Sequence, residues 1–156
     1  MKKWLFAFCI VLLAGCSSGK QTESQFTADE AIPFEIVGYE EKIDPVYGSI
    51  VPHIAYAKTE GQFESVKARF DMEHVEVDMN ESMALFIVTY SDSCGIAVDG
   101  VYNHNGNVSV QLLPGTGESC DKEGVPHTFV IKVAQGDYEK VQLFNGNTIK
   151  SSMDIE

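Results

Sequence analysis

Basic side chains are scarce in this sequence of 156 residues. It has 11 Lys and Arg against 23 Asp and Glu, which gives a formal net charge of −12. Binding to nucleic acid requires a basic surface that displaces counterions from the phosphates, and electrostatic docking to anionic lipid requires one as well. The sequence therefore predicts no nucleic-acid partner. Its hydrophobic fraction of 44% is ordinary for one globular domain and excludes wholesale disorder.

Familiar catalytic and cofactor motifs are also missing. The sequence has no Gly-x-Ser-x-Gly elbow, no phosphate-binding loop and no dinucleotide fingerprint. Its histidines occur singly, with neither His-x-x-x-His nor a neighbouring Cys-x-x-Cys, so zinc-type ligand spacing is absent. They are His53, His74, His104 and His127. We therefore expect no cofactor, no metal ion and no enzymatic activity.

No hydrophobic run is long enough to cross a membrane. The longest, Trp4 to Ala14, has about 11 residues, whereas a spanning helix needs about 20. It follows Lys2 and Lys3 and ends in Leu13-Ala14-Gly15-Cys16. A positive start, a short apolar run and small residues before a cleavage point are typical of a signal peptide, here predicted over residues 1–15.

The last four residues of this segment, 13–16, resemble the lipobox of bacterial lipoproteins. The resemblance implies cleavage before Cys16, a diacylglycerol thioether on its sulfur and acylation of its amino group. Each buried methylene contributes about 0.8 kcal/mol, so two or three chains would hold the protein at the extracytoplasmic side of a membrane, either the outer membrane or the outer face of the cell membrane. An ordinary secretory signal with a chance cysteine is the alternative. Residues 16–30 are then expected to be the lipidated cysteine and a flexible tether that spans about 20 Å.

The remaining sequence predicts a single β-rich domain over residues 31–150 and a polar tail over 151–156. Short apolar segments separated by turn signals predict about eight strands, among them an alternating segment at 75–79. Apolar residues at helical spacing, with Thr59 as a capping residue, predict one helix near residues 59–70. The predicted class is α+β, a mostly antiparallel β-sandwich or open barrel with that helix against one side.

One hairpin is predicted more sharply than the other turns. Asn105-Gly106 separates the alternating segments 96–102 and 107–113, and this dipeptide favours the tight turn of a hairpin. In the second segment, Val108, Val110 and Leu112 are expected to face the core, with Ser109 and Gln111 pointing outward.

Two cysteines remain after Cys9 leaves with the signal peptide and Cys16 is lipidated. In an exported domain, Cys94 and Cys120 are expected to form a disulfide. The alternative is a nucleophilic Cys94 thiol with His104 or His127 as its base.

The order of predicted elements across residues 34–143 resembles the PrcB-like protease-complex lipoprotein domain. The resemblance is carried by the segments Val75-Glu76-Val77-Asp78, Gly95-Ile96-Ala97-Val98, Val108-Ser109-Val110 and Pro126-His127-Thr128-Phe129-Val130-Ile131-Lys132-Val133. It implies a small lipoprotein that associates with and stabilises a surface protease. A Gly-Gly-aromatic signature of that family is replaced here by Ser93-Cys94-Gly95-Ile96, and no functional residue is carried over.

Together these features predict a lipid-anchored, non-enzymatic accessory module that binds another envelope or secreted protein. The loops near the cysteine pair, 90–95 and 113–127, are the expected contact surface, because loops on a rigid scaffold commonly carry contacts. A protease inhibitor or immunity-type protein is the alternative. A hydrolase that uses Cys94 or a carboxylate pair is a further one, with the candidate acids Glu73, Glu76, Asp78 and Glu81.

Overall fold

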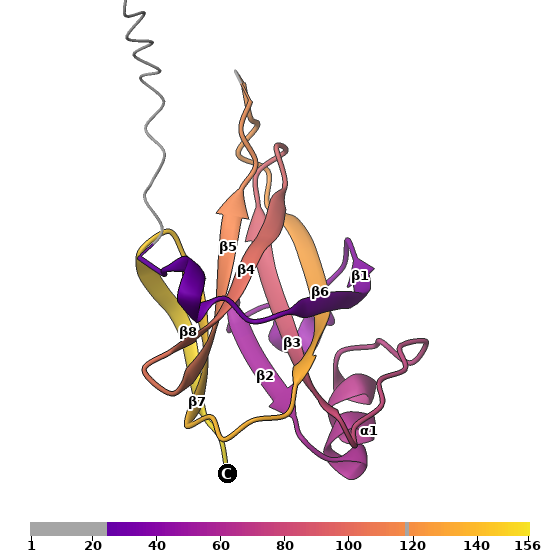
Figure 1. Ribbon diagram of the computed structural model, residues 1–156. Coiled ribbons are helices and arrows are strands. Elements are labelled where there is room, and N and C mark those ends of the chain that lie inside the picture. The colour runs from indigo at the N-terminus through magenta and orange to yellow at the C-terminus, as the bar shows by residue number, and fades with distance from the viewer. Residues whose placement is uncertain (1–24, 118) are drawn as a thin grey trace, which may run out of the picture.

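Figure 1 shows a computed structural model of the chain, which describes residues 25–117 and 119–156. Two four-stranded sheets pack face to face. The first has the strand order β1 (Phe34–Glu40), β6 (Val125–Ala134), β3 (Ser82–Ser91) and β2 (His53–Ala57). The second has the order β4 (Ile96–His104), β5 (Asn107–Pro114), β7 (Lys140–Asn145) and β8 (Thr148–Asp154). Every pairing is antiparallel except β5 with β7, so the predicted α+β sandwich is confirmed.

Three short helical segments accompany the sheets. The α-helix α1 (Glu60–Arg69) follows β2, and the 3-10 turns η1 (Ala28–Glu30) and η2 (Pro45–Tyr47) flank β1. Among the described residues, no helix is both long and apolar enough to span a membrane. The predicted signal peptide and Cys16 lie outside the described residues.

The main core lies between the two sheets. Leu85 and Ile87 of β3 and Ile131 of β6 meet Val110 of β5 and Leu143 of β7, all fully buried. Alternation along each strand directs these side chains to one face. The opposite face of β3 is covered by α1 and by residues 70–79. There Phe86 of β3 lies in a second buried cluster with Phe63, Phe70, Met72 and Val75. Because β3 is covered on both faces, its apolar run is continuous.

Local signals for the helix and the hairpin are confirmed. At the start of α1, the backbone N–H of Gln62 donates to Thr59 Oγ1 at 3.3 Å, and the Gln62 side chain accepts from the Lys58 N–H at 2.8 Å. Between β4 and β5, Asn105 and Gly106 have φ angles of 52° and 79°. Positive φ at both central residues is what a type I′ hairpin turn requires.

The predicted strand at 75–79 is wrong. Val75 and Met79 are buried and Glu76 and Asp78 are exposed, so the alternation is real, but the segment pairs with no strand of the described chain. Its neighbour in sequence, β3, is already paired with β2 on one side and β6 on the other. The segment therefore packs its apolar side chains across the sheet face without joining the hydrogen-bonded ladder.

Both predicted ends of the domain need correction. The tether prediction includes Phe26, yet this ring is only 6% exposed and stacks on Tyr102 with centroids 4.5 Å apart. The backbone N–H of Ile32 then donates to Val101 O at 2.9 Å, which ties the segment to β4. At the other end, β8 continues to Asp154, so four of the residues expected in a polar tail pair with β7.

The outward orientation predicted for Ser109 and Gln111 does not expose them. Both are buried, although they lie on the face of β5 that points away from the sandwich core. That face is covered because Phe26 packs against Tyr102 and against Phe144, whose ring centroid is 5.0 Å away. The second sheet thus buries part of its outer face under the residues that lead into β1.

Candidate binding site at the disulfide-bonded tip

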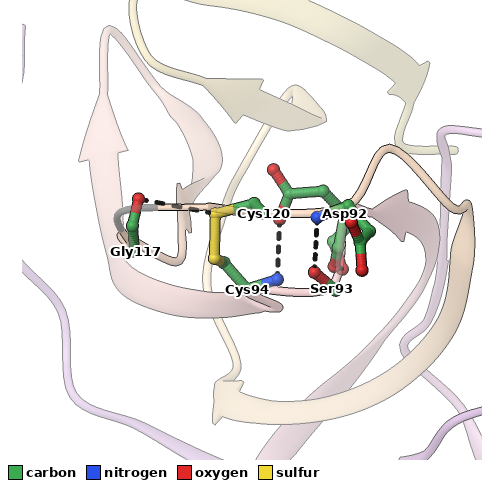
Figure 2. Close-up of a disulfide and its surroundings, with 7 residues drawn as sticks. Asp92, Ser93, Cys94, Gly117 and Cys120 are labelled. Atoms are coloured by element: carbon green, nitrogen blue, oxygen red, sulfur yellow. Dashed lines mark hydrogen bonds between the residues drawn. A yellow bond between two sulfur atoms is a disulfide. The ribbon is translucent and has the colours of Figure 1, made fainter.

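The two cysteines predicted to pair do form a disulfide at one end of the sandwich. Cys94 follows β3 and Cys120 lies between β5 and β6, with Cα atoms 5.4 Å apart. Figure 2 shows the bond joining the two connections, which we call the tip loops, residues 90–95 and 113–127. Because both sulfurs are bonded, Cys94 is not the free nucleophile of the alternative hypothesis.

Hydrogen bonds hold the tip loops together beside the disulfide. The backbone N–H of Asp121 donates to Ser93 Oγ at 2.7 Å, and the Ser93 N–H donates back to Asp121 O at 3.0 Å (Figure 2 shows the first). Asp92 Oδ1 accepts from the Cys94 N–H at 3.0 Å. These bonds and the disulfide therefore join residues 92–94 to residues 120 and 121, which restricts the backbone there before a partner binds.

Two glycines allow this close approach. A Cβ atom on Gly115 would lie 1.8 Å from Cys94 O, and one on Gly117 would lie 2.6 Å from Cys94 Sγ. Any larger residue would collide with the backbone or the sulfur of Cys94. The backbone N–H of Gly115 also donates to Gly95 O at 2.8 Å. These glycines support the disulfide rather than a ligand, and no motif in the sequence marks them.

Large apolar side chains are exposed at the tip. Tyr90 is 46% exposed and Leu113 is 51% exposed. Tyr90 borders two hollows, one of about 360 Å³ and one of about 260 Å³. The first is also lined by Ser91, Asp92 and Lys122, and the second is also lined by Thr89 and Leu112.

A hydrogen-bonded network of polar side chains lies beneath the tip, centred on a buried histidine. His127 is only 3% exposed. Its Nε2 lies 2.7 Å from Ser91 Oγ, and its Nδ1 lies 2.9 Å from the hydroxyl of Tyr39, which donates to Glu41 Oε1 at 3.2 Å. Strands β1, β3 and β6 position these groups, and both ring nitrogens have partners.

The protonation states of His127 and Tyr39 follow from their burial. Desolvation lowers the pKa of His127, and the negative charge of Glu41 opposes the shift. Desolvation likewise raises the pKa of Tyr39, and Glu41 adds to it. His127 is therefore neutral at pH 7. In one arrangement Ser91 donates to Nε2 and Nδ1–H donates to Tyr39, whose hydroxyl donates to Glu41. In the other, Tyr39 donates to Nδ1 instead of to Glu41, Nε2–H donates to Ser91, and Ser91 donates to Asp92 O.

The other predicted candidates are not brought together. His104 Nδ1 lies 2.5 Å from Glu30 Oε1, at the hairpin. His74 lies 3.5 Å from Glu40, and His53 stacks on Tyr47. The four carboxylates considered for acid–base work are all exposed, along the segment before β3 and at its start; they are Glu73, Glu76, Asp78 and Glu81.

One group of potential metal ligands occurs in residues 25–117 and 119–156. Asp92, Cys94 and Cys120 bring their ligand atoms within 4.8 Å of one another. The two sulfurs are bonded to each other, so neither is a thiolate, and a metal ion needs the deprotonated thiol. In the oxidised protein this group offers a metal ion only one carboxylate.

Comparison with known proteins adds no relative: no family model, no curated protein and no solved structure matches the chain. The resemblance to the PrcB-like domain stays a prediction.

Proposed function

We propose that this chain is a bacterial envelope protein, anchored to a membrane by lipid on Cys16, whose tip loops bind another envelope or secreted protein. The protein acts in this proposal as a non-enzymatic accessory module. The observation that carries the proposal is Tyr90, a half-exposed aromatic ring between two hollows on a surface stiffened by a disulfide. Aromatic side chains in such positions commonly supply most of the energy of a protein interface.

The chemistry of the tip suggests what the partner presents. The tip loops carry the exposed carboxylates Asp121 and Glu123, and the whole chain carries an acidic excess. Complementary charge speeds association and selects the partner. The expected partner surface is therefore apolar at its centre, where it covers Tyr90 and Leu113, and basic at its rim.

Photo-crosslinking in the native envelope tests this proposal. A photo-reactive amino acid at exposed Thr116 should give one crosslinked product, which the variant Tyr90→Ala should abolish. Glu64 on α1 provides the matched control, because α1 lies at the end of the sandwich away from the tip (Figure 1). The same product from both positions, or a product that survives Tyr90→Ala in a folded chain, would contradict the proposal.

The identity of the crosslinked protein separates the subclasses. A protease stabilised by this chain would support the PrcB-like resemblance, and a protease silenced by it would indicate an inhibitor. The anchor has its own test: the variant Cys16→Ala should move the protein from the membrane fraction to the soluble fraction. A protein that stays with the membrane would contradict lipid anchoring.

A hydrolase is the second candidate, and the contact between Ser91 and His127 favours it. Ser91 Oγ lies 2.7 Å from His127 Nε2, and Ser91 is one of the residues that line the hollow of about 360 Å³. In acyl transfer, Ser91 Oγ would bond to the substrate carbonyl carbon as its proton passes to Nε2, which then protonates the leaving group. Water, deprotonated by the same nitrogen, would cleave the acyl–serine bond and restore both residues.

A fluorophosphonate probe, which phosphonylates activated serines, tests this second candidate. Labelling should occur at Ser91 and should vanish in both Ser91→Ala and His127→Gln. Ser93→Ala is the control, since Ser93 Oγ lies on the same loop but bonds to the Asp121 N–H. Absence of labelling in the parent protein would refute the hydrolase.

A further inference from the structure

One border of the first sheet is open. Strand β1 pairs with β6 on one side, and Figure 1 shows no strand of the described chain on its other side. Apart from the ladder with β6, no residue of Phe34–Glu40 makes a backbone–backbone hydrogen bond anywhere in the described chain. An edge strand in this state presents a row of unpaired N–H and C=O groups, which is a template for a further strand.

The same strand carries a row of exposed apolar side chains. Phe34 is 36% exposed, Ile36 is 43% exposed and Tyr39 is 45% exposed. Their partners in β6 belong to the core cluster between the sheets, so the three side chains lie on the inner face of the first sheet. Their exposure shows that the second sheet does not cover this border.

A β-bulge keeps the row on one face. The register of β1 shifts between Ile36 and Gly38, and Val37 has no partner in β6. Many bulges protect an edge by twisting it away. Here, however, Tyr39 would lie on the opposite face from Phe34 without the extra residue, since side chains alternate along a strand. The bulge therefore extends the apolar row along the whole of β1.

The other three edge strands are less suited to pairing. Among the described residues, β2 and β4 carry no exposed large apolar side chain and β8 carries one, Ile149. At β4 the backbone N–H of Ile32 donates to Val101 O at 2.9 Å, and at β2 the N–H of Ile54 donates to Ser151 Oγ at 3.3 Å. The fold thus covers parts of two edges and keeps a third mostly polar, but it leaves β1 both open and apolar.

The chemistry of this border selects its occupant. Only an extended backbone satisfies a row of alternating N–H and C=O groups, and apolar side chains at every second position would cover Phe34 and Ile36. Residues 17–24 of the predicted tether contain no apolar side chain, so this segment of the chain does not match the row. The occupant is therefore expected to come from another molecule.

A second copy of β1 fits this border poorly. A symmetric antiparallel pair that uses the whole strand is centred on Val37, so the two bulges would face each other in the middle of the ladder. The strand also contains two glutamates and no basic residue, and the Glu35 side chain is 62% exposed beside Lys132. A second copy would bring only further negative charge, whereas a strand with lysine or arginine would bring the complement.

We propose that β1 is extended by a strand of another protein, which carries apolar side chains at alternate positions and lysine or arginine between them. The added strand continues the ladder of the first sheet and covers Phe34, Ile36 and Tyr39. The inference goes beyond the proposed function, because β1 is not part of the tip loops and forms a second contact surface.

Photo-crosslinking at two positions in the native envelope tests the inference. A photo-reactive phenylalanine analogue replaces Phe34 in one chain and Tyr39 in another. Both should crosslink to the same protein, and mass spectrometry should place the two crosslinked residues about four or five positions apart in one segment. Strand β6 provides the scale, because its partners of Phe34 and Tyr39 are Val133 and Phe129. That segment should alternate apolar and polar residues and contain lysine or arginine.

One substitution and a matched control show whether the apolar row is responsible. Ile36→Lys should abolish both crosslinks, because it places a charge in the middle of the row. Ile149→Lys should leave both unchanged, since this isoleucine is 50% exposed on β8, an edge strand of the other sheet. Circular dichroism of the purified full chain checks that each variant folds. If Ile36→Lys does not fold, the spacing of the crosslinked residues still decides.

Four results would overturn the inference. They are no crosslink from either position, a crosslink to a second copy of this chain, crosslinked residues scattered over separate segments, and crosslinks that persist in folded Ile36→Lys. The tip has its own readout at Thr116. A product at Thr116 without crosslinks from β1 refutes this inference alone, and crosslinks from β1 without a product at Thr116 refute the tip proposal alone.

Discussion

Removal of the Cys94–Cys120 disulfide is expected to lower the free energy of unfolding by about 3.5 kcal/mol. The bond joins residues separated by 26 positions, and closing a loop of that length removes about 12 cal/mol/K of entropy from the unfolded chain, or about 3.5 kcal/mol at 25 °C. Both cysteines are half-buried, so replacement by serine loses little packing. The two hydrogen bonds between Ser93 and Asp121 remain, which keeps the loops joined in the folded protein.

Urea unfolding of the double variant Cys94→Ser/Cys120→Ser, followed by circular dichroism, measures this difference. Replacing both residues leaves no new thiol at the tip. The dependence of stability on urea should also steepen, because an unfolded chain without the crosslink exposes more surface. Reductant serves as the control: it should lower the parent to the stability of the variant and leave the variant unchanged.

A loss below about 1 kcal/mol, with no change in the urea dependence, would refute the reasoning. It would mean that the unfolded chain keeps this loop closed without the bond, so that the loop-entropy calculation does not apply. A variant that keeps most of its stability but loses the tip crosslink would instead locate the role of the disulfide in the shape of the binding surface.

Three further changes have defined outcomes. Phe26→Ala should lower the free energy of unfolding by about 3 kcal/mol in urea, because the ring leaves its stacked position, whereas Val46→Ala, at an exposed site, should change it by less than about 0.5 kcal/mol. Gly38→Ala should lower the free energy of unfolding, measured by thermal unfolding, by about 1–3 kcal/mol, because the new Cβ would lie 2.6 Å from Val75 Cγ2. Stability should fall as the pH drops from about 7.5 to 5.5, since burial lowers the pKa of His127 and the unfolded chain takes up the proton first. Urea titrations across this range should show a smaller fall in His127→Gln, and an equal fall would contradict the assignment.

The parts of the fold that the sequence predicts correctly depend on interactions between near neighbours. Thr59 and Gln62 cap the helix three residues apart, and Asn105-Gly106 adopts the positive φ angles of its turn. Asn145-Gly146 before β8 is a turn signal of the same kind, and Gly146 has a φ angle of 58°. The strand that follows is polar and largely exposed, so hydrophobic alternation does not predict it.

The errors concern interactions between distant residues. Alternation at 75–79 correctly predicts which side chains are buried, but a strand also needs a partner, and both edges of β3 are occupied. Ser109 and Gln111 point away from the sandwich core as predicted, yet Phe26 and the residues that follow it help to cover that face. Nothing in the local sequence around Ser109 indicates such a cover.

The candidate site likewise has one part that the sequence predicts and one part that it does not. The cysteine pair is visible in the sequence and predicts which loops are held together, and the disulfide confirms that pairing. The contacts of His127 with Ser91 and Tyr39 join residues 36 and 88 positions apart, on three strands. Strand register creates them, and a lone histidine in a β-rich segment carries no sign of them.

Two buried polar side chains near the tip differ in how completely they are hydrogen-bonded. His127 has a partner on each ring nitrogen, so its burial is compensated and it stiffens the end of the sandwich. Gln111 is as deeply buried, but half of its amide is unsatisfied. Methionine or leucine at that position would fill similar space without an orphaned oxygen and would avoid a cost of about 1–3 kcal/mol. The contact between His127 and Ser91 holds the residue next to Tyr90, so the satisfied group fixes the base of the proposed binding surface.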